Sequence, residues 1–310
     1  MLSHEFGYWL QQFLNACTLA SFYVPLAVAY ALVQGITNKI FLSFGDFAMY
    51  AAFAAIYAGL AGLLAGSSTA VILAMSLALA VFSSSALGRF AATHVFAPLI
   101  SQSSQAFMIA SIGVSIVLQE VMRIQSANRD LWMMPLFDGA ALRIFDGTFP
   151  VQIGIMQIIA VATAIVSIGF VYIIMQFTAA GRYWKACSQS ERLAKLSGVN
   201  TLNVLRWACV GSAALASVSG WIIAVSYGGV TFSMGLMLGF KAMFASVIGG
   251  FGTLGGAIIG GIFLAFVETL WTATFPLAYR DVAVFSFIIL ILLLKPEGLY
   301  GTTIKRESED

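Results

Sequence analysis

The sequence predicts an all-α integral membrane protein, a polytopic bundle of about eight to nine transmembrane helices that form a single domain over residues 1–310. Three observations support this fold class. Of the 310 residues, 60% are hydrophobic and only 9% are charged, and the mean hydropathy is +0.95. A soluble domain would carry roughly 25% charged residues. The apolar residues form continuous runs, and a helix needs about 20 of them to cross a bilayer.

Apolar runs of spanning length follow one another along the chain. They lie near 9–33, 41–65, 69–88, 104–122, 151–177, 207–227, 233–249, 254–274 and 281–294. No Lys or Arg precedes the first run, which lacks the charged region of a signal peptide and is expected to remain as a span. The seventh run is short, rich in glycine and interrupted by Lys241, so the count falls to eight if it does not cross. The lipid bilayer is thus the chain's solvent, and a net charge of +2 gives no indication of nucleic-acid binding.

The distribution of Lys and Arg predicts the orientation, because cytoplasmic loops carry the excess of these residues. With nine spans and an outside N-terminus, the inner side receives Lys39, Arg89, Arg182, Lys185, Arg192, Lys195, Arg206, Lys295, Lys305 and Arg306, and the outer side receives Arg123, Arg129, Arg143 and Arg280. The C-terminus is then cytoplasmic. Eight spans would separate the basic segment at 178–206 from the basic tail, so nine fit the charges better.

The only long polar stretch, residues 178–206, is predicted to lie in the cytoplasm, where a partner can bind it. It carries its own helix signals: Ser188 or Ser190 as a cap, Leu193 and Leu196 three residues apart on one face, and Gly198 as a stop. A helix of two turns is marginal alone, which favours docking onto another protein over a loop that serves only topology.

Four charged residues interrupt the apolar runs: Asp46, Glu120, Lys241 and Glu268. A charge facing lipid is costly, so each is expected to face the bundle interior, a partner or a water-filled cavity. Lys241 and Glu268 lie in neighbouring antiparallel spans, which favours an ion pair over a role at the solute path or separate interfacial positions. Asp46 lies close to a span end and is expected to reach the interface. Glu120 and Arg123, one turn apart, are expected to form a solvated pair.

Glycines recur every four residues at Gly252, Gly256 and Gly260, and again at Gly235 and Gly239. This spacing places them on one helix face, where a neighbouring backbone can approach closely. Packing is the favoured interpretation, and lining of a solute path is the alternative.

The sequence contains no catalytic constellation, so the chain is predicted not to be an enzyme. His4 and His94 belong to no cluster spaced for a metal, and no cofactor motif is present. Cys17, Cys187 and Cys209 are interpreted as packing thiols. The absence of GxxxxGK[ST] excludes a P-loop, so any ATP that drives transport must be hydrolysed by another subunit. The outer loop at 123–150 is either a cap or docking surface over a path, or a plain connection.

Several motifs, in order and spacing, resemble the inner-membrane permeases of ABC importers of the branched-chain amino acid type. In the polar segment they are Gly181-Arg182, Ala186-Cys187 and Leu193-Ala194-Lys195-Leu196-Ser197-Gly198-Val199-Asn200. Elsewhere they are Leu42-Ser43-Phe44-Gly45-Asp46, Phe240-Lys241-Ala242-Met243, Gly249-Gly250-Phe251-Gly252-Thr253-Leu254-Gly255-Gly256, Glu268, Tyr279-Arg280-Asp281 and Lys295-Pro296-Glu297-Gly298-Leu299-Tyr300-Gly301. The resemblance covers about residues 9–301. The chain departs from the family at Phe44, where a histidine often stands, and at Ser190-Glu191-Arg192.

The resemblance implies a permease subunit that forms the transmembrane path for branched-chain or other hydrophobic amino acids. The implied partners are a second homologous permease in a heterodimer, two cytoplasmic ABC ATPases and a periplasmic solute-binding protein, in the bacterial inner membrane. The implied ATPase-coupling residues are Glu191, Arg192, Leu193, Ala194, Lys195, Leu196 and Gly198. Urea, short amides or small aromatic carboxylates are alternative solutes within the family. An ATPase-independent channel, a secondary transporter or a purely structural subunit is the alternative outside it.

Overall fold

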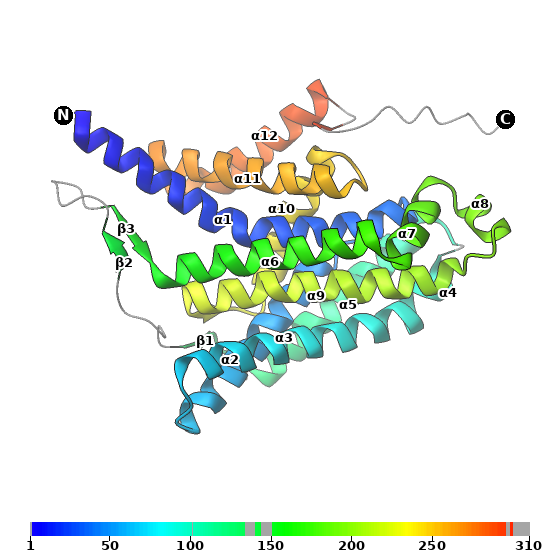
Figure 1. The fold of residues 1–310 in the computed structure, drawn as a ribbon, viewed down its shortest axis with the longest axis horizontal. Coiled ribbons are helices and arrows are strands. Elements are labelled where there is room, and N and C mark those ends of the chain that lie inside the picture. The colour runs from blue at the N-terminus through cyan, green and yellow to red at the C-terminus, as the bar shows by residue number, and fades with distance from the viewer. Residues whose placement is uncertain (1, 101, 134–139, 144–150, 296–297, 300–310) are drawn as a thin grey trace.

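The computed structural model describes residues 2–100, 102–133, 140–143, 151–295 and 298–299, and these are mostly helical (Figure 1). The helices are α1 (Leu2–Thr37), α2 (Phe44–Leu64), α3 (Thr69–Ala91), α4 (Ala97–Leu99), α5 (Ser104–Gln125), α6 (Ile155–Phe177), α7 (Ala179–Gln189), α8 (Glu191–Leu196), α9 (Thr201–Tyr227), α10 (Met234–Gly249), α11 (Leu254–Thr274) and α12 (Arg280–Leu294). A π-helical turn, η1 (Ala92–Phe96), joins α3 to α4, and a 3-10 turn, η2 (Leu277–Tyr279), precedes α12. Short strands pair β1 (Leu131–Trp132) with β4 (Gly229–Val230) and β2 (Ala140–Arg143) with β3 (Gln152–Gly154).

Eight helical segments in this described part are long and apolar enough to cross a membrane, which confirms the predicted fold class. One boundary difference is at α9, predicted from residue 207 but beginning at Thr201. Asn200 caps it, because the side-chain oxygen of Asn200 accepts the N–H of Asn203 at 3.1 Å. Polar residues in the first two turns hid this start from a search for apolar runs.

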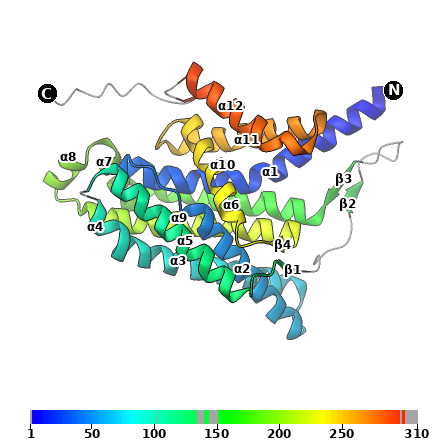
Figure 2. The same ribbon diagram turned by 180° about the vertical axis from the view of Figure 1, so that it is seen from behind.

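The seventh predicted span corresponds to α10, which has 16 residues. Its length of about 24 Å is less than the ~30 Å hydrocarbon core. Before α10 begins, α9 ends beside the β1–β4 pair. At its end, the turn after α10 lies against the end of α1 and against α7, because a Cβ at Gly35 would overlap both Gly252 and Trp184. α10 therefore returns the chain to the end of the bundle that carries α7 and α8 (Figure 2). Nine crossings stay a prediction, and this course of the chain through α10 agrees with it.

α1 and α9 form the centre of the bundle, with 83% of their spanning windows buried against 11% for α6. Small residues allow the close approach. A Cβ at Gly220 of α9 would overlap the carbonyl of Ala48 in α2, and one at Gly261 of α11 would lie 2.9 Å from the Cα of Val24 in α1. In contrast, α6 exposes large apolar side chains along its length, as lipid requires.

Candidate functional site

The polar segment 178–206 forms two short helices at one end of the bundle and the first residues of α9 (Figure 1). The first, α7, buries Gly181, Trp184 and Cys187 against the core. The indole N–H of Trp184 donates to the backbone carbonyl of Leu32 in α1 at 2.8 Å. The helix signals noted in the sequence begin only at Ser188, so α7 was missed. Its buried residues are three apart, which is the spacing that could have found it.

The second helix, α8, has the local structure predicted for it. The hydroxyl of Ser190 caps it by accepting the N–H of Leu193 at 3.3 Å. Gly198 ends the segment with a φ of +80°, a left-handed conformation that glycine adopts without steric cost. Glu191 and Lys195 form an exposed ion pair one turn apart at 2.6 Å. The predicted cap and stop are therefore confirmed.

α8 presents an apolar face to solvent. Leu193 is 64% exposed and Leu196 is 79% exposed, whereas Ala194 is buried against the rest of the chain. Arg192 and Lys195 are also exposed. Two protruding leucines flanked by basic side chains on a short, capped helix form a surface suited to the groove of another protein. The coupling role of these residues stays a prediction.

Two titratable groups lie near Glu191 of α8, the Cys187 thiol and the Lys39 ammonium. Cys187 is buried, and burial raises the pKa of its thiol, with the Glu191 carboxylate adding to the shift. On the neighbouring α1–α2 link, the Lys39 ammonium donates to the carbonyls of Ile100 at 2.7 Å and Gln102 at 2.8 Å. Partial burial lowers the pKa of Lys39, and Glu191 opposes that shift. The interpretation of Cys187 as a packing thiol is confirmed.

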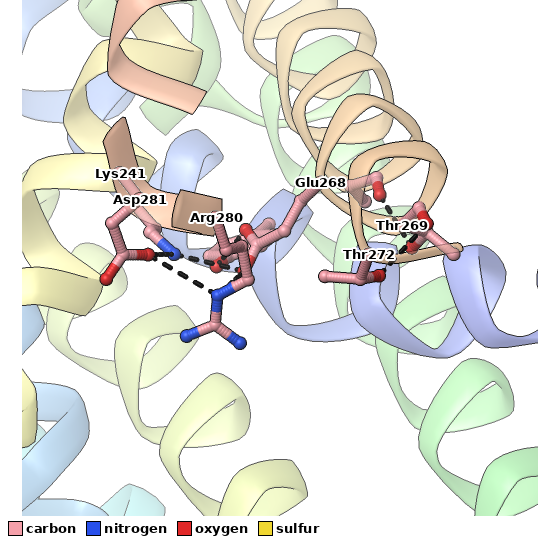
Figure 3. A network of polar contacts seen from close by, with 8 residues as sticks. Lys241, Glu268, Thr269, Thr272, Arg280 and Asp281 are labelled. Carbon is pink, nitrogen blue, oxygen red and sulfur yellow. Dashed lines mark hydrogen bonds and ion pairs between the residues drawn. The ribbon is translucent and has the colours of Figure 1, made fainter. Parts of the chain in front are cut away.

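A second polar site lies between α10, α11 and the start of α12, where four charged side chains form a closed cycle that we call the charge cluster (Figure 3). The Lys241 ammonium lies 3.0 Å from the Glu268 carboxylate and 2.7 Å from that of Asp281. Arg280 completes the cycle, at 3.3 Å from Glu268 and 3.4 Å from Asp281. The hydroxyl of Tyr23 in α1 donates to Glu268 at 2.8 Å.

The Lys241–Glu268 ion pair is therefore confirmed, whereas a role at the solute path stays a prediction. Lys241 and Glu268 are buried, and Arg280 and Asp281 are half-exposed. Sequence reasoning had not placed Arg280, Asp281 or Tyr23 in this cluster. The first two stand at the start of a span, where opposite charges are ordinarily solvated, so only the fold shows that they face inward.

A third polar site surrounds Asp46, and here the prediction that the side chain reaches the interface was wrong. Asp46 is fully buried in the first turn of α2. Its carboxylate accepts hydrogen bonds from the Ser115 hydroxyl and, at 2.8 Å, from the Gln119 amide, both in α5. A Cβ at Gly235 of α10 would overlap this carboxylate. Asp46 thus joins three helices.

The reason for this burial is that α2 begins inside the bundle. The N–H of Leu42 donates to the Ser111 hydroxyl at 3.2 Å, and its carbonyl accepts the Tyr30 hydroxyl at 3.2 Å. Tyr30 and Ser111 each lie seven residues from the adjacent end of their helices, which is about 10 Å. Such irregular backbone at membrane depth is tolerated only where protein covers it.

The glycines predicted to share one helix face do so only in part. Gly252 lies in the turn before α11 with a φ of +73°, so its placement with the other two was wrong; the positive φ ends the helical period there. Gly256 and Gly260 do pack against α10, because a Cβ at either would overlap the backbone of Gly249 or Ala245. Gly235 and Gly239 pack in the same way against the start of α2. Close packing accounts for these four.

Replacing Gly260 by alanine should destabilise the chain by about 1–3 kcal/mol, the usual cost of overfilling a packed core. The added methyl group would overlap the carbonyl oxygen of Ala245, which is backbone and cannot turn aside. Thermal unfolding of the purified chain measures the change. Gly211→Ala is the matched control, since no atom of another helix lies within 4 Å of its Cβ position in α9. Equal stability of the two variants would contradict the packing interpretation.

Two predictions for the outer side and one for the C-terminal tail remain. Glu120 and Arg123 form an exposed ion pair at 2.6 Å, as predicted. The loop at 123–150 is described only at 123–133 and 140–143, and the C-terminal tail at 300–310 lies outside the described residues. Whether the loop caps a path and whether the tail is cytoplasmic are therefore not tested.

Comparison with known proteins gives consistent results. Residues 12–294 match the family described as "Branched-chain amino acid transport system / permease component". The chain is 31% identical over 301 residues to the high-affinity branched-chain amino acid transport system permease protein LivH of Escherichia coli (strain K12), covering 97% of this chain and 98% of LivH. It is also 31% identical to the corresponding permease BraD of Pseudomonas aeruginosa, covering 96% and 97% of the two chains.

Proposed function

This chain belongs to the permease family of branched-chain amino acid transport systems, and we propose that it forms the transmembrane path of an ABC importer for branched-chain or other hydrophobic amino acids. The similarity to LivH and BraD over nearly the whole of each chain is the observation that carries this proposal. As a member of this family the chain is a transport subunit and a multi-pass membrane protein.

The proposed importer contains further subunits. Two cytoplasmic ABC ATPases hydrolyse ATP, a periplasmic binding protein delivers the solute, and a second homologous permease completes a heterodimer in the bacterial inner membrane. The sequence of this chain has no P-loop, so the ATP-binding step belongs to the partners. The exposed face of α8 is the proposed ATPase contact, and the C-terminus lies on the same, cytoplasmic side.

The contacts of α7 suggest how movement of the ATPases reaches the path. α8 follows α7 directly. The Trp184 side chain of α7 is hydrogen-bonded to the Leu32 carbonyl and packs against Gly35, both in α1. α1 in turn contacts α11 through Val24 and Gly261. A displacement of α8 would therefore move the central helix of the bundle. Movement of α1 would change access to a path between the two permeases, and no chemical step in this chain is required.

Uptake by the reconstituted importer tests the proposal. In liposomes that contain both permeases and the ATPases, with the binding protein outside, ATP inside should drive uptake of radiolabelled leucine, isoleucine or valine. This chain alone, or an assembly with hydrolysis-deficient ATPases, should take up none. Leucine uptake by the isolated chain under an ion gradient would instead support a secondary transporter. ATP-driven uptake of urea, short amides or aromatic carboxylates in place of leucine would correct the solute.

A further inference from the structure

A groove on the outside of the bundle lies beside α7 and has a volume of about 450 Å³. α1 forms its floor, with Val28 and Gly35 among the residues that line it. α6 and α11 form its walls, and Ile168 and Ile258 are typical wall residues. The end near α8 is bordered by α7 and by the turn between α10 and α11. The groove is apolar along its walls and polar at this end.

The groove has the depth of one lipid leaflet. It extends along α1 from Val28 to Asn38. The helix rises about 14 Å from Val28 to Thr37, where α1 ends, which is close to half of the ~30 Å hydrocarbon core. Its polar end lies where α6 ends and α11 begins, that is, at the membrane surface. Its apolar end lies near the middle of the bilayer.

The polar end carries a positive charge. The Lys185 ammonium lies there and donates to the Gln176 side-chain oxygen at 2.8 Å, while Ser188 and Thr253 add hydroxyl groups. None of the described residues that line the groove is acidic. A ligand that fits this distribution has an anionic head at the membrane surface and a hydrocarbon chain reaching to the midplane.

We infer that this groove binds an anionic phospholipid of the cytoplasmic leaflet, with its phosphate at Lys185 and an acyl chain between α6 and α11. Basic pockets between transmembrane helices on the cytoplasmic side bind such headgroups. The assignment to this leaflet rests on the orientation in the proposed function. A transmembrane helix of a partner fits less well, because α7 and the α10–α11 turn border the inner end, through which such a helix would have to continue. The bound lipid would contact Trp184, through which α7 is joined to α1.

Retention of lipid by the purified importer complex tests this inference. The complex is incubated with phosphatidylglycerol or phosphatidylcholine, and the lipid molecules that stay bound are counted by native mass spectrometry. The unmodified complex should retain phosphatidylglycerol in preference to phosphatidylcholine. Lys185→Gln should weaken phosphatidylglycerol retention about fivefold, the factor expected for one Lys near an anionic surface. Arg182→Gln removes an exposed charge of the same helix outside the groove and should change little.

A second pair of variants tests the acyl-chain position. Val171→Trp should fill the groove and displace the lipid, whereas Val166→Trp places the same side chain on the exposed, opposite face of α6. Equal retention of both lipids by all variants would overturn the inference. Loss of the second permease from Val171→Trp, with lipid retention unchanged, would also overturn it and make the groove a subunit contact. Lipid retention is measured without any transport, so its outcome does not depend on whether the uptake experiment succeeds.

Discussion

Replacing both Leu193 and Leu196 by aspartate should abolish ATP-driven uptake while the chain still folds and inserts into the membrane. Both side chains are exposed, so the bundle loses no packing when they change. At a protein interface, a buried apolar anchor is worth about 2 kcal/mol or more, which is over tenfold in affinity. The double variant should therefore no longer retain the ATPases on purification. Uptake and ATPase retention are measured on the same preparation.

The control for this variant is the same substitution at the other end of the molecule. Leu64 ends α2 and is 91% exposed, and Figure 1 shows the α2–α3 turn far from α8. Leu64→Asp should leave ATPase retention unchanged. If Leu193→Asp with Leu196→Asp keeps the ATPases bound and uptake intact, α8 is not their contact.

Removal of the Lys241 ammonium should strongly destabilise the chain. In Lys241→Met the buried carboxylate of Glu268 loses its nearest cation, and breaking a buried ion pair costs about 3–5 kcal/mol. The Arg280 guanidinium, 3.3 Å from the Glu268 carboxylate, still compensates part of this charge. We therefore expect a loss of unfolding free energy toward the lower end of this range. Chemical unfolding of the detergent-solubilised protein measures the loss of unfolding free energy.

Two further variants separate charge from packing in this experiment. Lys241→Met combined with Glu268→Gln removes the uncompensated charge and should recover most of the lost stability, because a neutral replacement of a buried pair is often tolerated. Glu120→Gln breaks the exposed pair with Arg123 and should hardly change the unfolding temperature. A double variant no more stable than Lys241→Met would show that the cluster acts through packing.

The fold class, most spans and the cap and stop of α8 were predictable, because each depends on local sequence. Continuous apolar runs specify spans, and Ser190 and Gly198 act within one helical turn of α8. The Lys241–Glu268 pair was also predictable, because the two opposite charges lie in neighbouring antiparallel spans and a charge within a span must avoid lipid.

The features that sequence reasoning missed depend on contacts between distant segments. Asp46 looked like a residue near a span end, but it is buried because α2 starts below the ends of α1 and α5. Gly252 looked like part of a helix face because its spacing matches, but it turns the chain ahead of α11. α7 was missed because polar, exposed residues surround Gly181, Trp184 and Cys187. Their spacing of three marks one helix face, but their burial against α1 depends on the fold.

The central claim is that α8 lies in the cytosol and is covered by an ATPase. A cysteine at position 196 tests it. The unmodified chain, with Cys17 half-buried and Cys187 and Cys209 buried, gives the background labelling to be subtracted. A membrane-impermeant maleimide should label Leu196→Cys in inverted vesicles but not in intact cells, and bound ATPase should protect it. Labelling in intact cells, or equal labelling with the ATPase bound, would contradict the account.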